Sequence, residues 1–356
     1  MPAAPTDLFL SLTPERVLLA ITAAGLECRS LCYPLNSYEN RVYEIELVDG
    51  ERVVAKFYRP QRWSREQILE EHRFLAELHE AEVPVCPMRM LPGGSTLRRT
   101  EHIYYALADR RGGRAPDELD ARDAERLGML VGRMHNVGAS HGAGSRRRLD
   151  ADQFVRRTIG WLESHATLPT HLETRYLTAA ESIARAADRC LQRVDHHRIH
   201  ADLHVGNVLY RDGRLRVLDF DDMAIGPAVQ DLWLALPGRD EETGRLRRHF
   251  IRGYEQFRHF DDAGLGLIEV LRGMRLVRYA GWLARRWHDP AFRTGWPHFG
   301  TPEYWEGETR DLEEQVEVIS RDESPPSRHE FDAGAPLAGD TDLLDNSDYF
   351  WDWEEE

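Results

Sequence analysis

The sequence predicts an α+β fold of two lobes, a small β-rich N-lobe and a larger, mainly helical C-lobe. Short segments that alternate apolar and polar residues, separated by turn signals, fill the part before residue 109. Helical periodicity dominates after residue 120, and a loop rich in glycine and arginine separates the two parts. We therefore predict an N-lobe over 1–108, a hinge over 109–114 and a C-lobe over 115–320.

The clearest element of the N-lobe is a predicted hairpin over 41–58. Apolar residues alternate with polar ones in its first strand, and Asp49-Gly50 is typical of a type I′ turn. Pro60 ends the return strand, because proline has no N–H to donate to a neighbouring strand.

A helix is predicted to follow this hairpin. Ser64 and Gln67 have the spacing of a capping box, in which the two side chains bind backbone N–H groups at the start of the helix. The helical pattern of apolar residues continues to about Glu80. One more strand, over 102–107, precedes the hinge.

The C-lobe is predicted to be helical except at one place. Apolar residues recur with helical spacing over 121–138, 151–164, 172–194, 241–258 and 264–288. The exception is a second hairpin over 208–218, in which Asp212-Gly213 forms a two-residue turn.

Composition and charge exclude several classes of protein. The chain has 356 residues and a net charge of −15, of which −10 comes from 321–356, where twelve acidic residues accompany two arginines. This segment is typical of a disordered acidic tail, and the negative charge argues against general binding of nucleic acid. No apolar run suits a membrane span, the first residues lack a secretory pattern, and four cysteines make no disulfide framework. We expect a cytoplasmic monomer.

The strongest chemical signal is the loop His200–Asn207, which has the sequence H-A-D-L-H-V-G-N and fits the kinase catalytic loop H-x-D-L-x-x-x-N. In such a loop the aspartate reaches the attacking hydroxyl, and the asparagine turns back to a magnesium ion. Asp202 is therefore the candidate catalytic residue and Asn207 a candidate metal ligand. The expected cofactor is ATP with Mg²⁺.

The second hairpin supplies another candidate metal ligand. Its two-residue turn sets the strand register so that Asn207 faces Leu218, and Asp219 lies one residue beyond. The two side chains should thus lie close together, and both offer the hard oxygen ligands that Mg²⁺ prefers. Asp219-Phe220-Asp221 occupies the position of the kinase D-F-G, with aspartate in place of glycine.

Lys56 is the only lysine among 46 lysine and arginine residues, and it lies on the return strand of the first hairpin. Kinases use a lysine at this position for the ATP phosphates and pair it with a glutamate on the following helix. Of three candidates, Glu71 lies inside the apolar stripe of that helix, Glu66 points nearly opposite, and Glu70 lies just outside the edge. An inward-facing carboxylate needs a partner, so we predict that Lys56 pairs with Glu71.

The chain has no G-x-G-x-x-G motif to cover the phosphates. The corresponding place, just before the first hairpin, holds the polar loop Leu35–Arg41. A loop of small polar residues can still offer amides and a hydroxyl to phosphate, and Ser37 is the natural candidate.

Together these motifs resemble the aminoglycoside and choline phosphotransferase superfamily. Within it the sequence resembles the bacterial stress response kinase A family, a group of cytoplasmic Ser/Thr protein kinases. Inside 8–320, the resemblance is carried by the segments 35–43, 56–60, 226–233, 274–277 and 289–292. It implies a protein-kinase-like fold in which Asp202 accepts a proton, Asn207 and Asp219 hold magnesium, and Ser37 contacts ATP. Asp219 is also counted among the active-site acids.

One residue departs from the family pattern. The family usually has glycine before the catalytic aspartate, where this chain has Ala201. A methyl group at that position is comfortable only if the backbone angle φ is negative.

Several alternatives remain open. His196, His197, His200 and His204 surround Asp202 in the sequence, so a zinc site is one of them, although His200 is better explained as a hydrogen-bonding residue that orients the loop. The acceptor could be a small hydroxyl compound, such as an amino alcohol, a sugar or an aminoglycoside, instead of a protein. A nucleotide-binding scaffold without catalytic activity is the third alternative.

Overall fold

The computed structural model describes residues 9–165 and 167–321, and the predicted acidic tail over 321–356, apart from Arg321 itself, lies outside this part of the chain. The chain forms two compact units. The first consists of the chain up to Gly113 together with Gly144–Arg146 and Arg285–Pro297, and the second consists of the remaining described residues. Both short segments of the first unit fall within the predicted C-lobe.

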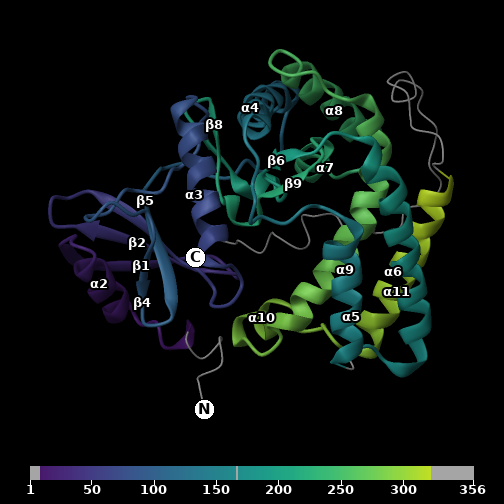
Figure 1. The fold of residues 1–356 in the computed structure, drawn as a ribbon, viewed down its shortest axis with the longest axis horizontal. Coiled ribbons are helices and arrows are strands. Elements are labelled where there is room, and N and C mark those ends of the chain that lie inside the picture. The colour runs from purple at the N-terminus through teal and green to yellow at the C-terminus, as the bar shows by residue number, and fades with distance from the viewer. Residues whose placement is uncertain (1–8, 166, 322–356) are drawn as a thin grey trace. The chain divides into compact units, whose positions relative to one another are not determined.

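The first unit contains a five-stranded antiparallel sheet with the strand order β1-β2-β3-β5-β4 (Figure 1). Helices α2 and α3 pack on its opposite faces. The elements of this unit are α2 (Pro14–Ala23), β1 (Cys28–Leu35), β2 (Arg41–Leu47), β3 (Arg52–Phe57), α3 (Arg65–Glu80), β4 (Arg98–Thr100), β5 (Ile103–Asp109) and α10 (Pro290–Gly295).

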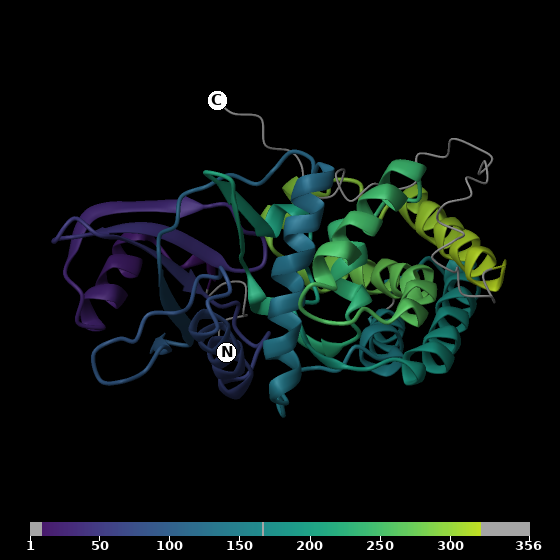
Figure 2. The same cartoon turned by 90° about the horizontal axis from the view of Figure 1, so that it is seen from above.

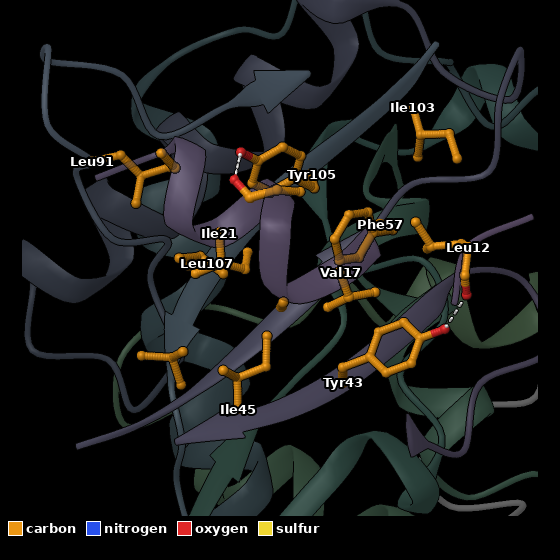
Figure 3. Close-up of a cluster of buried hydrophobic side chains, with 14 of the residues drawn as sticks. Leu12, Val17, Ile21, Tyr43, Ile45, Phe57, Leu91, Ile103, Tyr105 and Leu107 are labelled. Atoms are coloured by element: carbon orange, nitrogen blue, oxygen red, sulfur yellow. Dashed lines mark hydrogen bonds between the residues drawn. The ribbon is translucent and has the colours of Figure 1, made fainter. Parts of the chain in front are cut away.

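The alternation of side chains along β3 separates a structural face from a chemical one. Val53, Ala55 and Phe57 are buried on the α2 side, in the apolar cluster of Figure 3. The Tyr43 hydroxyl in this cluster donates to the carbonyl of Leu12 at 3.2 Å, which satisfies a buried polar group. Lys56 alternates to the other face of the sheet, the side of α3.

The first hairpin and its helix are confirmed, but the predicted turn type is wrong. A type I′ turn requires a positive φ at both Asp49 and Gly50. Gly50 has a φ of 87°, but Asp49 is not among the described residues with a positive φ. The Gly50 amide donates to the Leu47 carbonyl at 2.9 Å, so the turn holds one more residue and leaves the left-handed conformation to glycine alone. The capping box at the start of α3 is present as predicted.

The second unit is mainly helical (Figures 1 and 2). Its longer elements are α4 (Ala121–Ser140), α5 (Arg157–Ser164), α6 (Thr170–Cys190), α7 (Val229–Ala235), α8 (Glu241–Tyr254), α9 (Ile268–Arg286) and α11 (Pro302–Arg321). Helices α4 and α8 approach so closely that a Cβ at Gly128 would come within 1.9 Å of the Phe250 carbonyl oxygen. Glycine at this position is therefore a packing requirement, since a side chain would push the helices apart.

Short strands interrupt these helices around the catalytic loop. The antiparallel pairs are formed by β6 (His197–Ile199) with β9 (Ala224–Gly226) and by β7 (Val208–Arg211) with β8 (Arg214–Val217). In the latter hairpin Val208 faces Val217, and both Asp212 and Gly213 have positive φ, as the sequence predicted.

The five predicted C-lobe helices are all present, with ends that differ by several residues. The sequence did not predict α2 or α11, although α11 buries Trp305 and Leu312 against the rest of its unit. Within the described part of the chain, no helix is both long and apolar enough to cross a membrane.

Glu308 on α11 is a buried acid, with 6% of its surface exposed. Burial, together with the nearby Asp311, raises its pKa to about 8, although a hydrogen bond from Tyr304 acts in the opposite direction. The folded protein therefore keeps this proton over a pH range in which the unfolded chain has lost it. The stability that the protonated acid contributes is fully present below the unfolded pKa of 4.5 and is lost as the pH rises through about 8.

Replacing Glu308 by glutamine should remove this pH dependence. We expect Glu308→Gln and the wild type to unfold at similar urea concentrations at pH 5, and the variant to be more stable at pH 8.5 by on the order of 4 kcal/mol. Urea titrations at the two pH values measure the difference. The exposed Glu306, replaced by glutamine, is the matched control. A difference between Glu308→Gln and wild type that stays constant with pH would contradict the prediction.

Candidate functional site

In the first unit the predicted ion pair between Lys56 and Glu71 is present. The Lys56 Nζ atom lies 3.3 Å from Glu71 Oε1, and the side chains are 11% and 0% exposed. The ammonium also lies 5.0 Å from the centre of the Tyr58 ring. A carboxylate on α3 and an aromatic ring on the adjoining segment thus fix the position of the chain's only lysine.

The other two glutamates of α3 do not take this role. Glu70 accepts a hydrogen bond from the backbone amide of Ser145 at 2.9 Å, and Glu66 lies on the exposed side of the first turn. Their positions agree with the helical angles that the sequence predicts, because only Glu71 of the three faces inward from the apolar stripe.

Ser37 lies in the loop between β1 and β2. Its Oγ accepts a hydrogen bond from the amide of Asn40 at 3.3 Å, and Asn40 Oδ1 accepts one from the amide of Arg59 at 3.2 Å. Hydrogen bonds of the Ser37 and Asn40 side chains therefore hold the loop in a compact turn. The Ser37 hydroxyl, which accepts the hydrogen bond from the Asn40 amide, also has a proton that it can donate to an oxygen of a ligand.

In the second unit the catalytic loop and the β7–β8 hairpin bring three predicted residues together. Asn207 Nδ2 donates to the backbone carbonyl of Asp202 at 2.9 Å. The Leu218 amide donates to the Asn207 carbonyl at 2.8 Å, which closes the open end of the hairpin and sets Asp219 beside it. The register that the sequence predicts from the Asp212-Gly213 turn thus accounts for this arrangement.

These residues fit a magnesium site completed by phosphate oxygens. The Asn207 amide nitrogen is directed to Asp202, so its carbonyl oxygen faces outward, and Asp219 offers a carboxylate. Asp219 has a φ of 54°, a left-handed conformation that aspartate adopts more readily than most other non-glycine residues. Two protein oxygens are what Mg²⁺ usually takes when phosphates and water supply the rest.

Both ring nitrogens of His200 have hydrogen-bond partners. His200 Nδ1 accepts from the Asp202 amide at 3.2 Å, and its Nε2 donates to the Leu218 carbonyl at 2.7 Å. His200 thus joins the catalytic loop to the hairpin, as its loop-orienting interpretation predicts. Over the described residues, no group of three or more histidine, cysteine, aspartate or glutamate side chains could hold a metal, so the zinc alternative gains no support.

The sequence left open that one or two of the five arginines on the helix of α9 line the substrate cleft, but it did not single out Arg275 as the partner of Asp202. Arg275 Nη1 donates to Asp202 Oδ1 at 2.9 Å, and both side chains are about a quarter exposed, at 24% and 27%. Burial would raise the pKa of Asp202, but Arg275 and then His204 outweigh it, and the pKa lies below its usual value. Nothing in the sequence distinguishes this arginine from the others on α9, because the contact spans 73 residues.

Asp231, in the first turn of α7, holds the backbone of the loop His200–Asn207 in place. The sequence reasoning gave this residue no role. Its carboxylate accepts the amides of His200 at 2.8 Å and Ala201 at 2.7 Å. His135 Nε2 lies 3.0 Å from the same carboxylate, and both side chains are fully buried. Asp231 therefore fixes the backbone immediately before Asp202.

Ala201 has a φ of 67°. A methyl group is unfavourable at this positive angle, so the backbone at this position is strained. The surrounding contacts hold it there. Asp231 binds its amide, and Gln230 Nε2 donates to its carbonyl at 3.2 Å. Both polar groups of the strained peptide are thus satisfied by consecutive residues of α7.

Glycine at position 201 should relieve this strain. We expect Ala201→Gly to raise the free energy of unfolding by about 0.5–1 kcal/mol, since the gain from removing the left-handed strain exceeds the entropy that glycine adds to the unfolded chain. Thermal and urea unfolding measure this change. A loss of stability would show that the alanine methyl contributes more by packing than it costs in strain.

Comparisons with known proteins show which family the chain resembles. The model of the phosphotransferase enzyme family matches residues 32–268. "Stress response kinase A" of Escherichia coli K12 is 39% identical over 320 residues, which is 89% of this chain and 96% of that protein. "Serine/threonine protein kinase RdoA" of Salmonella typhimurium is 39% identical over 314 residues, covering 87% of this chain and 94% of that protein.

Two solved structures with a similar fold are named as kinases of small molecules. Amicoumacin kinase hAmiN, solved in complex with AMP-PNP, Ca²⁺ and its ligand, has a TM-score of 0.70 at 20% identity and covers 91% of this chain and 98% of its own. A microcompartment-associated aminopropanol kinase has a TM-score of 0.65 at 19% identity, over 85% of this chain and 98% of its own. At this level of identity the likeness extends to the fold alone.

Proposed function

The chain belongs to the phosphotransferase enzyme family, in its stress response kinase A branch, and from this premise we propose that it transfers the γ-phosphate of ATP to a serine or threonine hydroxyl of a protein. It is a kinase that uses a nucleotide and a divalent metal ion. The observation that best supports the proposed mechanism is the convergence of Asp202, Asn207 and the end of the β7–β8 hairpin.

The first unit supplies phosphate-binding groups in this proposal. Lys56, which Glu71 and Tyr58 hold in place, neutralises charge on the α- and β-phosphates. The Ser37 hydroxyl and the amides of its loop bind phosphate oxygens. Because the lysine is fixed before ATP binds, little free energy is lost in ordering its long side chain.

The second unit supplies the metal ligands and the acceptor site. Asn207 and Asp219 hold Mg²⁺, which neutralises charge on the phosphate oxygens when it is bound. Asp202 stays ionised beside Arg275 and binds the acceptor hydroxyl, which it orients for attack and whose proton it accepts as the new bond forms. Positioning and charge neutralisation therefore provide most of the rate acceleration.

A protein acceptor is supported by the curated relatives, which match nearly their whole length, and one of which is named a serine/threonine protein kinase. The structural neighbours favour the second candidate, a small hydroxyl acceptor such as an amino alcohol or an antibiotic. A scaffold without activity is disfavoured because Lys56, Asp202, Asn207 and Asp219 are all present.

Transfer from radiolabelled ATP in the presence of Mg²⁺ decides between the acceptors. Wild type and Asp202→Ala are each given a generic protein substrate, no added substrate, and a panel of amino alcohols, sugars and aminoglycosides. Label on protein serine or threonine, absent with the variant, supports the proposal. Label confined to the small molecules moves the function to the second candidate, and ATP binding without any transfer would favour the scaffold.

A further inference from the structure

Three of the segments that carry the family resemblance meet at one buried arginine in the first unit. Arg59 follows β3, the loop residues Tyr38 and Glu39 precede β2, and Asp289 begins α10, 230 residues after Arg59. The Arg59 and Asp289 side chains are 5% and 1% exposed. Burying such charges is costly unless they are paired and hydrogen-bonded, so this contact has a structural purpose.

The Arg59 guanidinium holds the backbone of the Ser37 loop directly. Its Nε donates to the Glu39 carbonyl at 3.0 Å, and its Nη2 donates to the Tyr38 carbonyl at 3.0 Å. The same Nη2 donates to Asp289 Oδ2 at 2.9 Å. The planar guanidinium spreads its donors over two successive carbonyls and a carboxylate, a geometry that the compact ammonium of a lysine does not reproduce.

This contact also sets the direction of the loop amides. The C=O and N–H groups of a trans peptide point in opposite directions. Since the carbonyls of Tyr38 and Glu39 point to Arg59, the amides of Glu39 and Asn40 point to the opposite side of the loop. On that side the Asn40 amide donates to the Ser37 hydroxyl oxygen at 3.3 Å, so the amide fixes the hydroxyl in place. The hydroxyl keeps its own proton to donate to a ligand oxygen.

We propose that Arg59, anchored by Asp289, is a positioning residue that holds the backbone of the Ser37 loop so that the Ser37 hydroxyl faces the phosphates of ATP. The inference rests on the proposed function, in which this loop binds phosphate. A glycine-rich loop reaches phosphate because its backbone is unhindered. The Asn36–Asn40 loop has no glycine, and a buried arginine holds it in the binding conformation instead.

The segment Arg285–Pro297 holds the same loop at further points. Arg286 Nη2 donates to Glu39 Oε1 at 2.7 Å, and the Tyr38 and Trp296 rings lie 4.7 Å apart. Burial acts to raise the pKa of Glu39, but Arg62 and Arg286 lower it more, so this carboxylate stays charged within the network. A segment far along the chain is therefore part of the nucleotide-binding half.

The test is Arg59→Lys, which keeps the charge and removes the fork. We expect KM for ATP to rise by about tenfold or more, with a parallel loss of affinity for a fluorescent ATP analogue measured without turnover, and little change in KM for the acceptor. An unchanged KM for ATP in the folded variant overturns the inference and leaves the phosphotransferase activity standing. Failure of the wild type to transfer phosphate from ATP overturns the proposed function instead.

A matched control separates positioning from general loss of stability. Arg247 in the second unit is also buried, and it donates to the carbonyls of Leu236 at 2.7 Å and Gly238 at 2.8 Å. We expect Arg247→Lys to lower the melting temperature in the same way and to leave KM for ATP unchanged. An equal rise in KM in this control would overturn the inference.

A double-mutant cycle with Ser37→Ala shows whether Arg59 acts through the loop. If it does, the two substitutions are not additive, and the double variant binds ATP about as weakly as Arg59→Lys alone. Additive losses would overturn the inference. Should Arg59→Lys fail to fold, Asp289→Asn keeps the cap of α10 and weakens the anchor, and a rise in KM for ATP with that variant is the expected result.

Discussion

Replacing Asp202 by asparagine is expected to lower kcat by about a thousandfold and to leave KM for ATP nearly unchanged. Asparagine can still accept the hydrogen bond from Arg275, so the loop keeps its shape. It cannot take the proton of the acceptor hydroxyl or attract that hydroxyl with a negative charge. Steady-state kinetics with the acceptor identified by radiolabelling measure both constants.

Asp222→Asn is the control for this experiment. Asp222 lies close enough to Asp202 in the fold to act on it electrostatically, and it forms its own ion pair with Arg278 at 2.8 Å, so the substitution changes the local charge by the same amount. We expect a change in kcat of a few fold at most, because Asp222 has no part in the proposed mechanism. Equal losses in the two variants would mean that local charge, and not Asp202 itself, sets the rate.

The second large effect is expected at Asp231. An asparagine there presents one oxygen and one NH₂ group to the two backbone amides that the carboxylate now accepts. One of the two buried backbone N–H groups then faces the NH₂ group of the asparagine, which is also a donor, and loses its acceptor. We therefore expect a loss of about 2–4 kcal/mol in the free energy of unfolding. A fall in kcat should accompany it, since the backbone before Asp202 loses its support.

Two comparisons make this prediction specific. Asp120→Asn is the same substitution at the exposed cap of α4, and it should cost well under 1 kcal/mol. Asp231→Ala should be more damaging than Asp231→Asn, because it removes every acceptor for the two amides and for His135. A stable and fully active Asp231→Asn variant would show that the catalytic loop does not depend on this carboxylate.

The parts of the structure that local patterns predicted are those that local interactions determine. The Asp212-Gly213 turn sets the register of its hairpin, and from that register the proximity of Asn207 and Asp219 follows. Helical angles alone select Glu71 over its neighbours as the partner of Lys56.

The contacts that were missed all join residues far apart in the sequence. Arg275 reaches Asp202 across 73 residues, and Arg59 reaches Asp289 across 230. Each of these arginines has the same local appearance as many others in an arginine-rich chain. Their partners follow from how helices and loops pack, which periodicity does not encode. The turn type at Asp49 was predicted wrongly for a local reason. A turn with one more residue can join the same two strands, and the sequence does not distinguish the two turns.

Because Lys56 is the only lysine, reagents that react with amines can label one side chain selectively. An acylating reagent that reacts with primary amines finds a single side-chain target in all 356 residues. In the fold that target is shielded by its salt bridge with Glu71, with only 11% of its side chain accessible. The labelling rate of one atom therefore reports how often the Lys56–Glu71 bridge opens, and no tag or engineered cysteine is needed to observe it.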